Sequence, residues 1–355
     1  MGVVALTLAE LLTEAHANNA SDLHITVGVP PKMRIHGEII TMNYPRLSTE
    51  DTEALVKNIM GEYQKRVFAE RGEIDFSFGL AGMGRYRVNV FRQRGTTAAV
   101  FRLVGVTVPE PEELGVPQQI IDLYDKKSGL VLVTGPTGSG KSTTLASMIG
   151  RINKNLSSHI ITLEDPIEYL HRHEKSVVNQ REIGVDTNSY AAALRAALRE
   201  DPDVILVGEM RDLETISTAI TAAETGHLVF STLHTIGAAE TVDRIIDVFP
   251  DEQQDQIKVQ LSTVLEAVVS QRLIRNAEGN GRVAAFEVML ANSAIRNLIR
   301  EGKTYQIPSI MQTSKKFGMQ TMDDSLYELY RTGQINRKQA LLYSVDNELM
   351  EKKML

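Results

Sequence analysis

Residues 130–143 read LVLVTGPTGSGKST, in which an apolar run of strand character stops at a glycine-rich turn followed by lysine, serine and threonine. The turn GPTGSGKS fits the spacing G-x-x-x-x-G-K-[ST], and it lies between a predicted strand and a predicted helix, the context that this spacing requires. Glycines let successive backbone N–H groups turn inward around phosphate oxygens, and the helix that follows directs its positive end at the same anion. The segment therefore predicts an α/β fold with a nucleotide-binding loop at the end of one strand.

The residues of this loop have distinct expected roles. The turn and the first helical residues are expected to bind the nucleotide: Gly135, Pro136, Thr137, Gly138, Ser139, Gly140, Lys141, Ser142 and Thr143. Lys141 is predicted to reach the terminal phosphates of ATP, and the Ser142 hydroxyl to ligate Mg²⁺. The alternative is a surface turn that is merely rich in glycine, but this does not explain why strand, spacing, lysine and hydroxyl occur together.

Two later segments place carboxylates at the ends of predicted strands. The apolar run 204–207 leads into Gly208 and Glu209, and ITLEDPIEY places Glu164 and Asp165 before a proline. Ligand crevices open at the carboxyl ends of parallel strands, so Glu209 is predicted to support Mg²⁺, in part through its water shell. A phosphate loop with strand-end carboxylates predicts hydrolysis of the nucleotide. The alternative, that these acids cap turns or helices, stays open at this point.

The segment TGHLVFSTLHT contains two histidines, His227 and His234, at opposite ends of one predicted strand. This separation is too long for both side chains to ligate one small metal ion, so we predict no metal site here. One of them is expected to contact the γ-phosphate or to sense its loss. A hydrogen-bonded, half-buried histidine is the alternative.

The pattern of apolar residues changes along the chain. Before residue 106, short strands alternate with short helices and predict an α+β domain with an antiparallel sheet, whose first helix begins with a capping box of Thr7 and Glu10. The segment VTVPEPEELGVP concentrates proline and acid, which suits neither a helix interior nor a central strand. After it, apolar strands alternate with helices, as in a parallel sheet covered on both faces.

These changes predict the domain organisation. We expect an N-terminal domain over residues 1–108, a proline-rich linker over 109–117 and a nucleotide-binding domain over 118–355. From about residue 251 the chain is predicted to be largely helical. This region includes AIRNLIREGK, whose apolar residues recur at helical spacing and whose glycine falls where a C-terminal cap is expected.

Composition excludes several classes of protein. The chain has 355 residues, a formal net charge of −7 and no cysteine. It can form no disulfide and no cysteine-ligated metal site, and its acidic balance does not favour a broad basic surface for nucleic acid. Its longest apolar runs are far too short to cross a bilayer, and its start lacks the pattern of a secretory signal. We therefore expect a cytoplasmic protein that does not insert into a membrane.

Four segments occur in order along the chain: GPTGSGKST, ITLEDPIEY, DPDVILVGEMRD and TGHLVFSTLHT. Together they resemble the Walker A, Asp box, Walker B and His box of the secretion ATPases that power type II and type IV secretion and type IV pili. The resemblance covers nearly the whole chain. It implies a RecA-like P-loop NTPase domain, a smaller N-terminal α+β domain of PAS-like fold and a helical C-terminal region.

Within these ATPases the sequence is most similar to the PilT-type retraction ATPases of the type IV pilus. Three features carry this similarity: a short N-terminal domain without an extra leading domain, the absence of cysteine, and AIRNLIREGK over residues 294–303. The resemblance implies an ATP-hydrolysing motor for pilus retraction and twitching motility. An extension or secretion ATPase of the same superfamily is the nearest alternative. A nucleic-acid-translocating ATPase and a nucleotide-gated scaffold are more distant ones.

The family's residue roles transfer to the matching positions in this chain. Glu164 matches the catalytic base of the Asp box, and Glu209 matches the Walker B acid. His227 and His234 belong to the His box and are expected to couple the state of the nucleotide to neighbouring structure.

The resemblance also implies an assembly. Family members are ring hexamers in which arginines of the N-terminal domain reach the nucleotide, and Arg87 in YRVNVF and Arg102 in VFRLV stand at the matching positions. A basic sheet face is the alternative for these arginines. The implied cofactors are ATP and Mg²⁺. The implied partners are further copies of the chain and a PilC-like platform protein of the inner membrane, contacted from the cytoplasmic face, with no nucleic acid.

Overall fold

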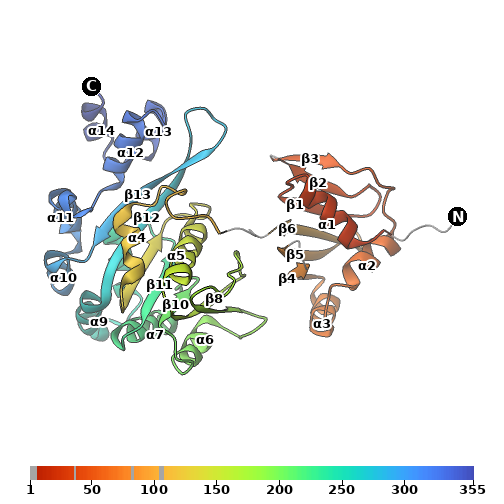
Figure 1. The fold of residues 1–355 in the computed structure, drawn as a ribbon, viewed down its shortest axis with the longest axis horizontal. Coiled ribbons are helices and arrows are strands. Elements are labelled where there is room, and N and C mark those ends of the chain that lie inside the picture. Colours follow the sequence, from red (N-terminus) through yellow and green to blue (C-terminus); the bar gives the residue numbers. More distant parts are fainter. Residues whose placement is uncertain (1–5, 36, 81–83, 104–107) are drawn as a thin grey trace. The chain divides into compact units, whose positions relative to one another are not determined.

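The computed structural model of the chain describes residues 6–35, 37–80, 84–103 and 108–355. The chain divides into two compact units. One comprises residues 1–107 and 166–170, and the other comprises residues 108–165 and 171–355. Each unit consists of a sheet with helices packed on it, as Figure 1 shows.

The first unit is an α+β domain on a six-stranded antiparallel sheet, in the order β3-β2-β1-β6-β5-β4. Its elements are α1 (Leu8–Ala17), β1 (Asp22–Ile25), β2 (Lys32–Ile35), β3 (Glu38–Thr41), α2 (Thr49–Lys57), α3 (Glu62–Arg71), β4 (Glu73–Leu80), β5 (Gly84–Gln93) and β6 (Thr96–Leu103). Leu11, Leu23 and Phe101 are almost fully buried between helices and sheet. Thr7 and Glu10 form the predicted capping box, with Glu10 N 3.3 Å from Thr7 Oγ1. The α+β prediction is confirmed.

The second unit is built on a seven-stranded sheet in the order β13-β12-β7-β11-β10-β8-β9, which is parallel except for the β12–β13 pair. Its strands are β7 (Gly129–Thr134), β8 (His159–Glu164), β9 (Val177–Glu182), β10 (Val204–Val207), β11 (Leu228–Leu233), β12 (Leu265–Arg275) and β13 (Arg282–Leu290). Its α-helices are α4 (Gln118–Ile121), α5 (Lys141–Asn155), α6 (Tyr190–Ala197), α7 (Leu213–Glu224), α8 (Ala238–Asp247), α9 (Asp251–Val264), α10 (Ser293–Arg300), α11 (Ile307–Thr313), α12 (Met322–Arg331), α13 (Arg337–Tyr343) and α14 (Asn347–Lys353). Single 3₁₀ turns are η1 (Asp122–Asp125), η2 (Thr304–Gln306) and η3 (Lys315–Phe317).

Helices cover both faces of this sheet, and strand β7 shows why its sequence is uniformly apolar. Leu130 and Leu132 point into a core shared with α6 to α9, while Val131 and Val133 point into a core shared with α4 and α5. All four are at most 1% exposed. A parallel strand buried on both faces has no polar side to alternate with, so the predicted parallel sheet is confirmed.

The structure corrects the extent of the helical C-terminal region. After α9 the chain forms the antiparallel pair β12–β13 at one edge of the sheet before it becomes helical at residue 293. The buried polar residues Ser270 and Gln271 interrupt the apolar pattern of β12 and conceal its strand character. From residue 293 the prediction holds, and Ile295 and Ile299 of α10 are fully buried, as their helical spacing requires.

The proline-rich segment 108–117 contains neither a helix nor a strand. Val116 is buried in the core beside α4 and α5. Glu110 and Glu112 form ion pairs with Arg151 of α5. The segment is therefore attached to the second unit at the helix that follows the phosphate loop.

Among the residues that the structure describes, no helix has the length and apolar character needed to span a bilayer.

Candidate active site

The glycine-rich loop connects β7 to α5, and its backbone conformation depends on glycine. Gly135, Gly138 and Gly140 have positive φ angles of +138°, +79° and +90°. A Cβ added at Gly135 would lie 2.3 Å from the backbone oxygen of Gln271 on β12, so any larger residue would displace the loop. Gly140 is the N-cap of α5, whose first residue is Lys141. The loop therefore ends at a helix N-terminus, where phosphate binds well.

The side chains of this loop fit a nucleotide. Lys141 donates hydrogen bonds from Nζ to the backbone oxygens of Gly135 (2.8 Å) and Pro136 (3.2 Å), so its ammonium group lies over the loop. Ser139 is 3% exposed, and its hydroxyl has no hydrogen-bond partner among the described residues. A buried hydroxyl of this kind is what a phosphate oxygen would satisfy. Ser142, at the start of α5, is exposed.

Glu209 lies just beyond the end of β10, with its side chain 18% exposed. Its Oε1 is 2.8 Å from Nε of Arg211, and its Oε2 is 3.5 Å from Nε2 of His234. Gly208 lets the chain pass closely beside β8, since an added Cβ would lie 3.1 Å from the backbone oxygen of Leu163. The carboxylate of Glu209 is therefore held from two sides, at the carboxyl ends of the parallel strands.

Glu164 ends β8, the strand next to β10. Its Oε1 accepts hydrogen bonds from Thr162 Oγ1 (2.6 Å) and from Gln180 Nε2 on β9 (3.0 Å). Asp165, the next residue, is exposed. Two donors on one oxygen orient the carboxylate, which is what a residue that positions a water molecule requires.

Tyr190, the first residue of α6, lies among these acids. Burial raises the pKa of its phenol, and the carboxylates of Glu209, Asp165 and Glu164 raise it further. An added Cβ at Gly208 would lie 2.8 Å from the Tyr190 hydroxyl. The Tyr190 hydroxyl therefore lies close to the residues that follow both β8 and β10. The parallel sheet brings Glu164 and Glu209 to the same edge, where the phosphate loop also begins.

The two histidines, His227 and His234, lie at opposite ends of β11. His234 follows β11 and reaches Glu209. His227 precedes β11, and its Nδ1 lies 2.9 Å from the backbone oxygen of Ala222 at the end of α7. Strand β11 pairs in parallel with β7, so His227 stands beside Gly129, where β7 begins. Within this chain, His234 lies at the carboxyl ends of the parallel strands, which we call the nucleotide edge, together with Glu209. His227 lies at the opposite ends of the strands.

Arg87 and Arg102 lie in the first unit as direct cross-strand neighbours on β5 and β6. Arg87 Nε is 3.8 Å from Asp75 Oδ1, and Arg102 Nε is 2.9 Å from Asp22 Oδ1. Their side chains are 50% and 68% exposed. The two predicted arginines therefore stand together on one sheet and leave much of their surface accessible.

Several site residues could not be predicted from the sequence. Gln180, which donates to Glu164, lies outside the four motifs, and Tyr190 is separated from both acids along the chain. Thr162 lies within ITLEDPIEY, but no role was predicted for it. The sequence did contain a signal for Arg211, because this residue stands two positions after Glu209 in the segment DPDVILVGEMRD. A strand alternation placing Thr162 and Glu164 on one face of β8 was the available signal for the threonine.

Among the described residues, no three His, Asp or Glu side chains come close enough together to hold a metal ion. The hard oxygen donors of Ser142 and Glu209 suit Mg²⁺. A parallel sheet with its loop, its two acids and its histidine on one edge is that of a RecA-like P-loop nucleoside triphosphatase.

Comparison with known proteins supports this class of protein and identifies a family within it. The family model described as "Type II/IV secretion system protein" matches residues 1–341. The "Twitching motility protein" of Neisseria gonorrhoeae is 49% identical over 98% of this chain and 93% of its own length. The "Type IV pilus retractation ATPase PilT" of Pseudomonas aeruginosa is 50% identical, over 94% of this chain and 97% of its own.

A solved structure shows the same fold. The crystal structure titled "Pilus Retraction Motor PilT and Bound ADP" superimposes with a TM-score of 0.92 at 53% identity, covering 98% of this chain and 99% of the other. The chain therefore belongs to the type II/IV secretion system protein family. It is a nucleotide-binding ATPase of the PilT type, as the four ordered motifs predicted.

Proposed function

We propose that the protein hydrolyses ATP to power the retraction of type IV pili, and thereby twitching motility. The observation that carries this proposal is the arrangement of Lys141, Glu164 and Glu209 at or after the carboxyl ends of parallel strands of one sheet, in a chain about half identical to a retraction ATPase over nearly its full length. The acids distinguish a hydrolase from a scaffold that only binds nucleotide.

The residues of the site support a division of labour. Lys141 and the backbone N–H groups of the loop bind the phosphates, and Ser142 and Glu209 would hold Mg²⁺, which would neutralise phosphate charge. Glu164 orients the attacking water, because Thr162 and Gln180 fix its carboxylate. Arg211 and His234 hold Glu209 in place. His227 acts elsewhere, at the opposite edge of the sheet.

We further propose that the working form is a ring of six copies. Arg87 and Arg102, side by side on the first unit, would then supply positive charge to the γ-phosphate, within a subunit or across an interface. A cation of this kind is worth about 10³- to 10⁵-fold in rate. We also propose that residues 1–108 and 118–355 act as the two domains of this motor, and that 109–117, which belongs to the second compact unit, acts as the linker between them.

The partner that fits this motor is the PilC-like platform protein of the inner membrane, and the site of action is its cytoplasmic face. A motor that turns or releases pilus subunits must act on a membrane-embedded component. Sequential binding and release of nucleotide around a ring supply the motion that such a partner would follow.

The test uses the purified full chain. Turnover of ATP in the presence of Mg²⁺ should be measurable and should fall at least about 100-fold in Glu209→Gln, while nucleotide binding is kept. Light scattering should give the mass of six copies. Single-stranded DNA should leave turnover unchanged, whereas stimulation by it would favour a nucleic-acid translocase. Equal turnover of the variant and the wild type would contradict the assigned site.

A further inference from the structure

One buried carboxylate holds the first N–H groups of two helices. Glu287 of β13 accepts a hydrogen bond from Ala238 N through Oε1 (2.7 Å) and another from Met322 N through Oε2 (3.3 Å). Ala238 begins α8, and Met322 begins α12. Burial raises the pKa of Glu287, and the two backbone N–H groups counteract this rise. Each oxygen of Glu287 therefore has a different helix as its partner.

The cross-strand neighbour of Glu287 holds the same start of α8. Ser270 of β12 stands opposite Glu287 in the antiparallel register, and its hydroxyl accepts a hydrogen bond from Gly237 N (3.1 Å). Ser270 is fully buried. Together the pair binds two consecutive N–H groups of the chain. These groups directly follow the loop that His234 begins at the nucleotide edge.

The next residue of β12 contacts the phosphate loop. Gln271 is 3% exposed, and its Oε1 accepts a hydrogen bond from Thr144 Oγ1 of α5 (2.8 Å). Its backbone oxygen faces Gly135, as the close approach of an added Cβ shows. Two adjacent residues of β12 thus contact the phosphate loop and the start of α8.

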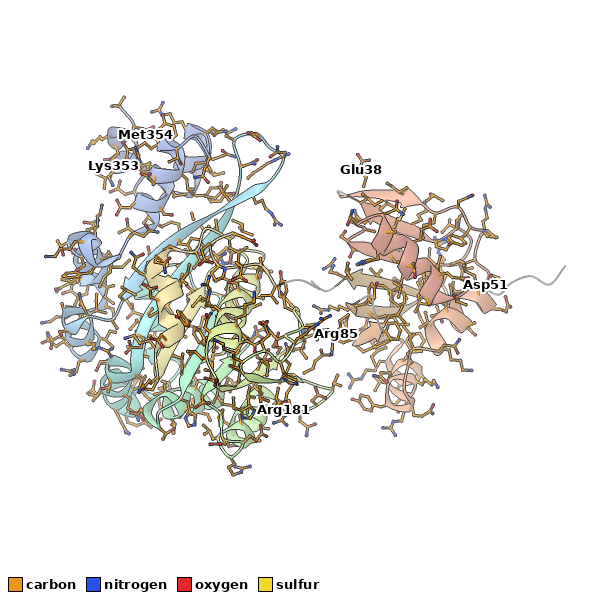
Figure 2. The ribbon with its side chains drawn as sticks, in the orientation of Figure 1. Glu38, Asp51, Arg85, Arg181, Lys353 and Met354 are labelled. Carbon is orange, nitrogen blue, oxygen red and sulfur yellow. The ribbon has the colours of Figure 1, made fainter. Side chains whose placement is uncertain are left out.

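On its other side, α12 is joined to the end of the chain. Asp323, which is 8% exposed, accepts hydrogen bonds from Val345 N (2.7 Å) and Asp346 N (3.0 Å), just before α14. Lys353 of α14, labelled in Figure 2, donates to Asp324 Oδ1 (3.1 Å). Figure 1 shows α12, α13 and α14 as one group, and α12 lies beside β13. The helix that Glu287 holds is therefore tied to the last helix of the chain.

We propose that Glu287 and Ser270 form a positioning pair that couples the loop after β11 to the C-terminal helices α12–α14. The inference rests on the proposed function, because that loop responds to nucleotide through His234 and Glu209. A displacement of the loop moves the start of α8. Since one carboxylate holds both α8 and α12 in a close-packed interior, the start of α12 follows. The C-terminal helices then report the state of the nucleotide to whatever contacts them.

Hydrogen exchange of the full chain, with and without ADP, tests this coupling. In the wild type, ADP should slow exchange in the phosphate loop and also, by about tenfold, at the amides of Met322, Val345 and Asp346. In Glu287→Gln, protection of the phosphate loop should persist while the distant effect falls below about twofold. The glutamine amide has only one acceptor oxygen, and its NH₂ group repels the second N–H.

Ser325→Ala is the matched control. Ser325 Oγ accepts a hydrogen bond from Phe286 N (3.0 Å), so this variant weakens the attachment of α12 to β13 without touching α8. It should keep the distant response. Ser270→Ala tests the α8 side and should reduce the response even if Glu287→Gln folds poorly.

Two results would overturn the coupling. One is protection of the wild-type phosphate loop by ADP with no change at Met322. The other is an equal distant response in Glu287→Gln, Ser270→Ala and Ser325→Ala. A wild-type phosphate loop that ADP does not protect would contradict the proposed function instead, so the two claims fail in different ways.

Discussion

Nε2 of His234 lies 3.5 Å from Oε2 of Glu209, across the ends of the neighbouring strands β11 and β10. Arg211 holds the other oxygen of Glu209 at 2.8 Å. Glu209 is thus oriented both by its own segment and by the residue that follows the strand beside it. Because His234 also begins the loop that leads to α8, this contact joins the nucleotide edge to the rest of the second unit.

Replacing His234 by asparagine should lower kcat about tenfold, since Glu209 loses one of the two groups that orient it. The affinity for ATP should change by less than about threefold, because the phosphate loop is untouched. Phosphate release at saturating ATP measures the first quantity and fluorescent nucleotide titration the second. His159→Asn is the control, because His159 begins β8 at the opposite edge of the sheet. Equal losses in both variants would argue against a specific role for His234.

Gln180 should matter for hydrolysis more than for binding. Its Nε2 donates to Glu164 Oε1 (3.0 Å), so Gln180→Ala should lower kcat about tenfold with little change in the affinity for ATP. Asn179→Ala is the matched control, because neighbouring residues of β9 point to opposite faces of the sheet. The comparison uses phosphate release from both variants. A loss of affinity with unchanged kcat would show that Glu164 is not positioned in this way.

Two glycines of the phosphate loop should respond differently to alanine. At Gly135 a Cβ would meet the backbone oxygen of Gln271 at 2.3 Å, so Gly135→Ala should lower the free energy of unfolding by about 3 kcal/mol or more and abolish ATP binding. At Gly138 no atom lies within 4 Å of the added Cβ, so only the positive φ of +79° opposes alanine, at about 1–2 kcal/mol. Urea unfolding checks both values. Equal costs would contradict the close approach of β12 to the loop.

The stability of the second unit should fall in mild acid because of His171. Burial lowers the pKa of this histidine from 6.5 to about 4. Between pH 6.5 and pH 4, His171 therefore binds a proton in the unfolded chain but not in the folded one. For this reason the free energy of unfolding decreases as the pH falls towards 4. The expected loss at pH 5 is about 2 kcal/mol.

Urea unfolding at pH 7 and pH 5 measures this loss. The decrease between the two values should be smaller by about 2 kcal/mol in His171→Asn than in the wild type. His16→Asn, which removes an exposed histidine of α1, should leave the decrease unchanged. A wild-type decrease that survives in His171→Asn would assign the acid sensitivity to other groups.

The parts of the fold that follow from local rules were predictable. An uninterrupted apolar strand such as β7, a capping box such as Thr7 with Glu10, and a glycine-rich turn before a helix each express their structure in a few adjacent residues. The positions of Glu164 and Glu209 at one edge also followed, because parallel strands deliver their carboxyl ends to the same side.

The remaining features depend on contacts between distant segments. Strand β12 carries buried Ser270 and Gln271, whose side chains form hydrogen bonds with the N-cap of α8 and with α5, so its sequence resembles that of a half-exposed segment. Tyr190 and Gln180 join the site only because α6 and β9 fold beside β8. A local sequence pattern cannot predict a hydrogen bond whose partner lies in another helix or strand.

The most direct test of the central claim is to observe labelled pili on living cells whose native gene carries Glu209→Gln. If hydrolysis at this site powers retraction, the cells should carry many pili, retraction events should disappear, and twitching should stop. Cells without pili would instead show that the protein drives pilus assembly. Normal retraction by cells that contain only the inactive variant would contradict the assignment of this ATPase as the retraction motor.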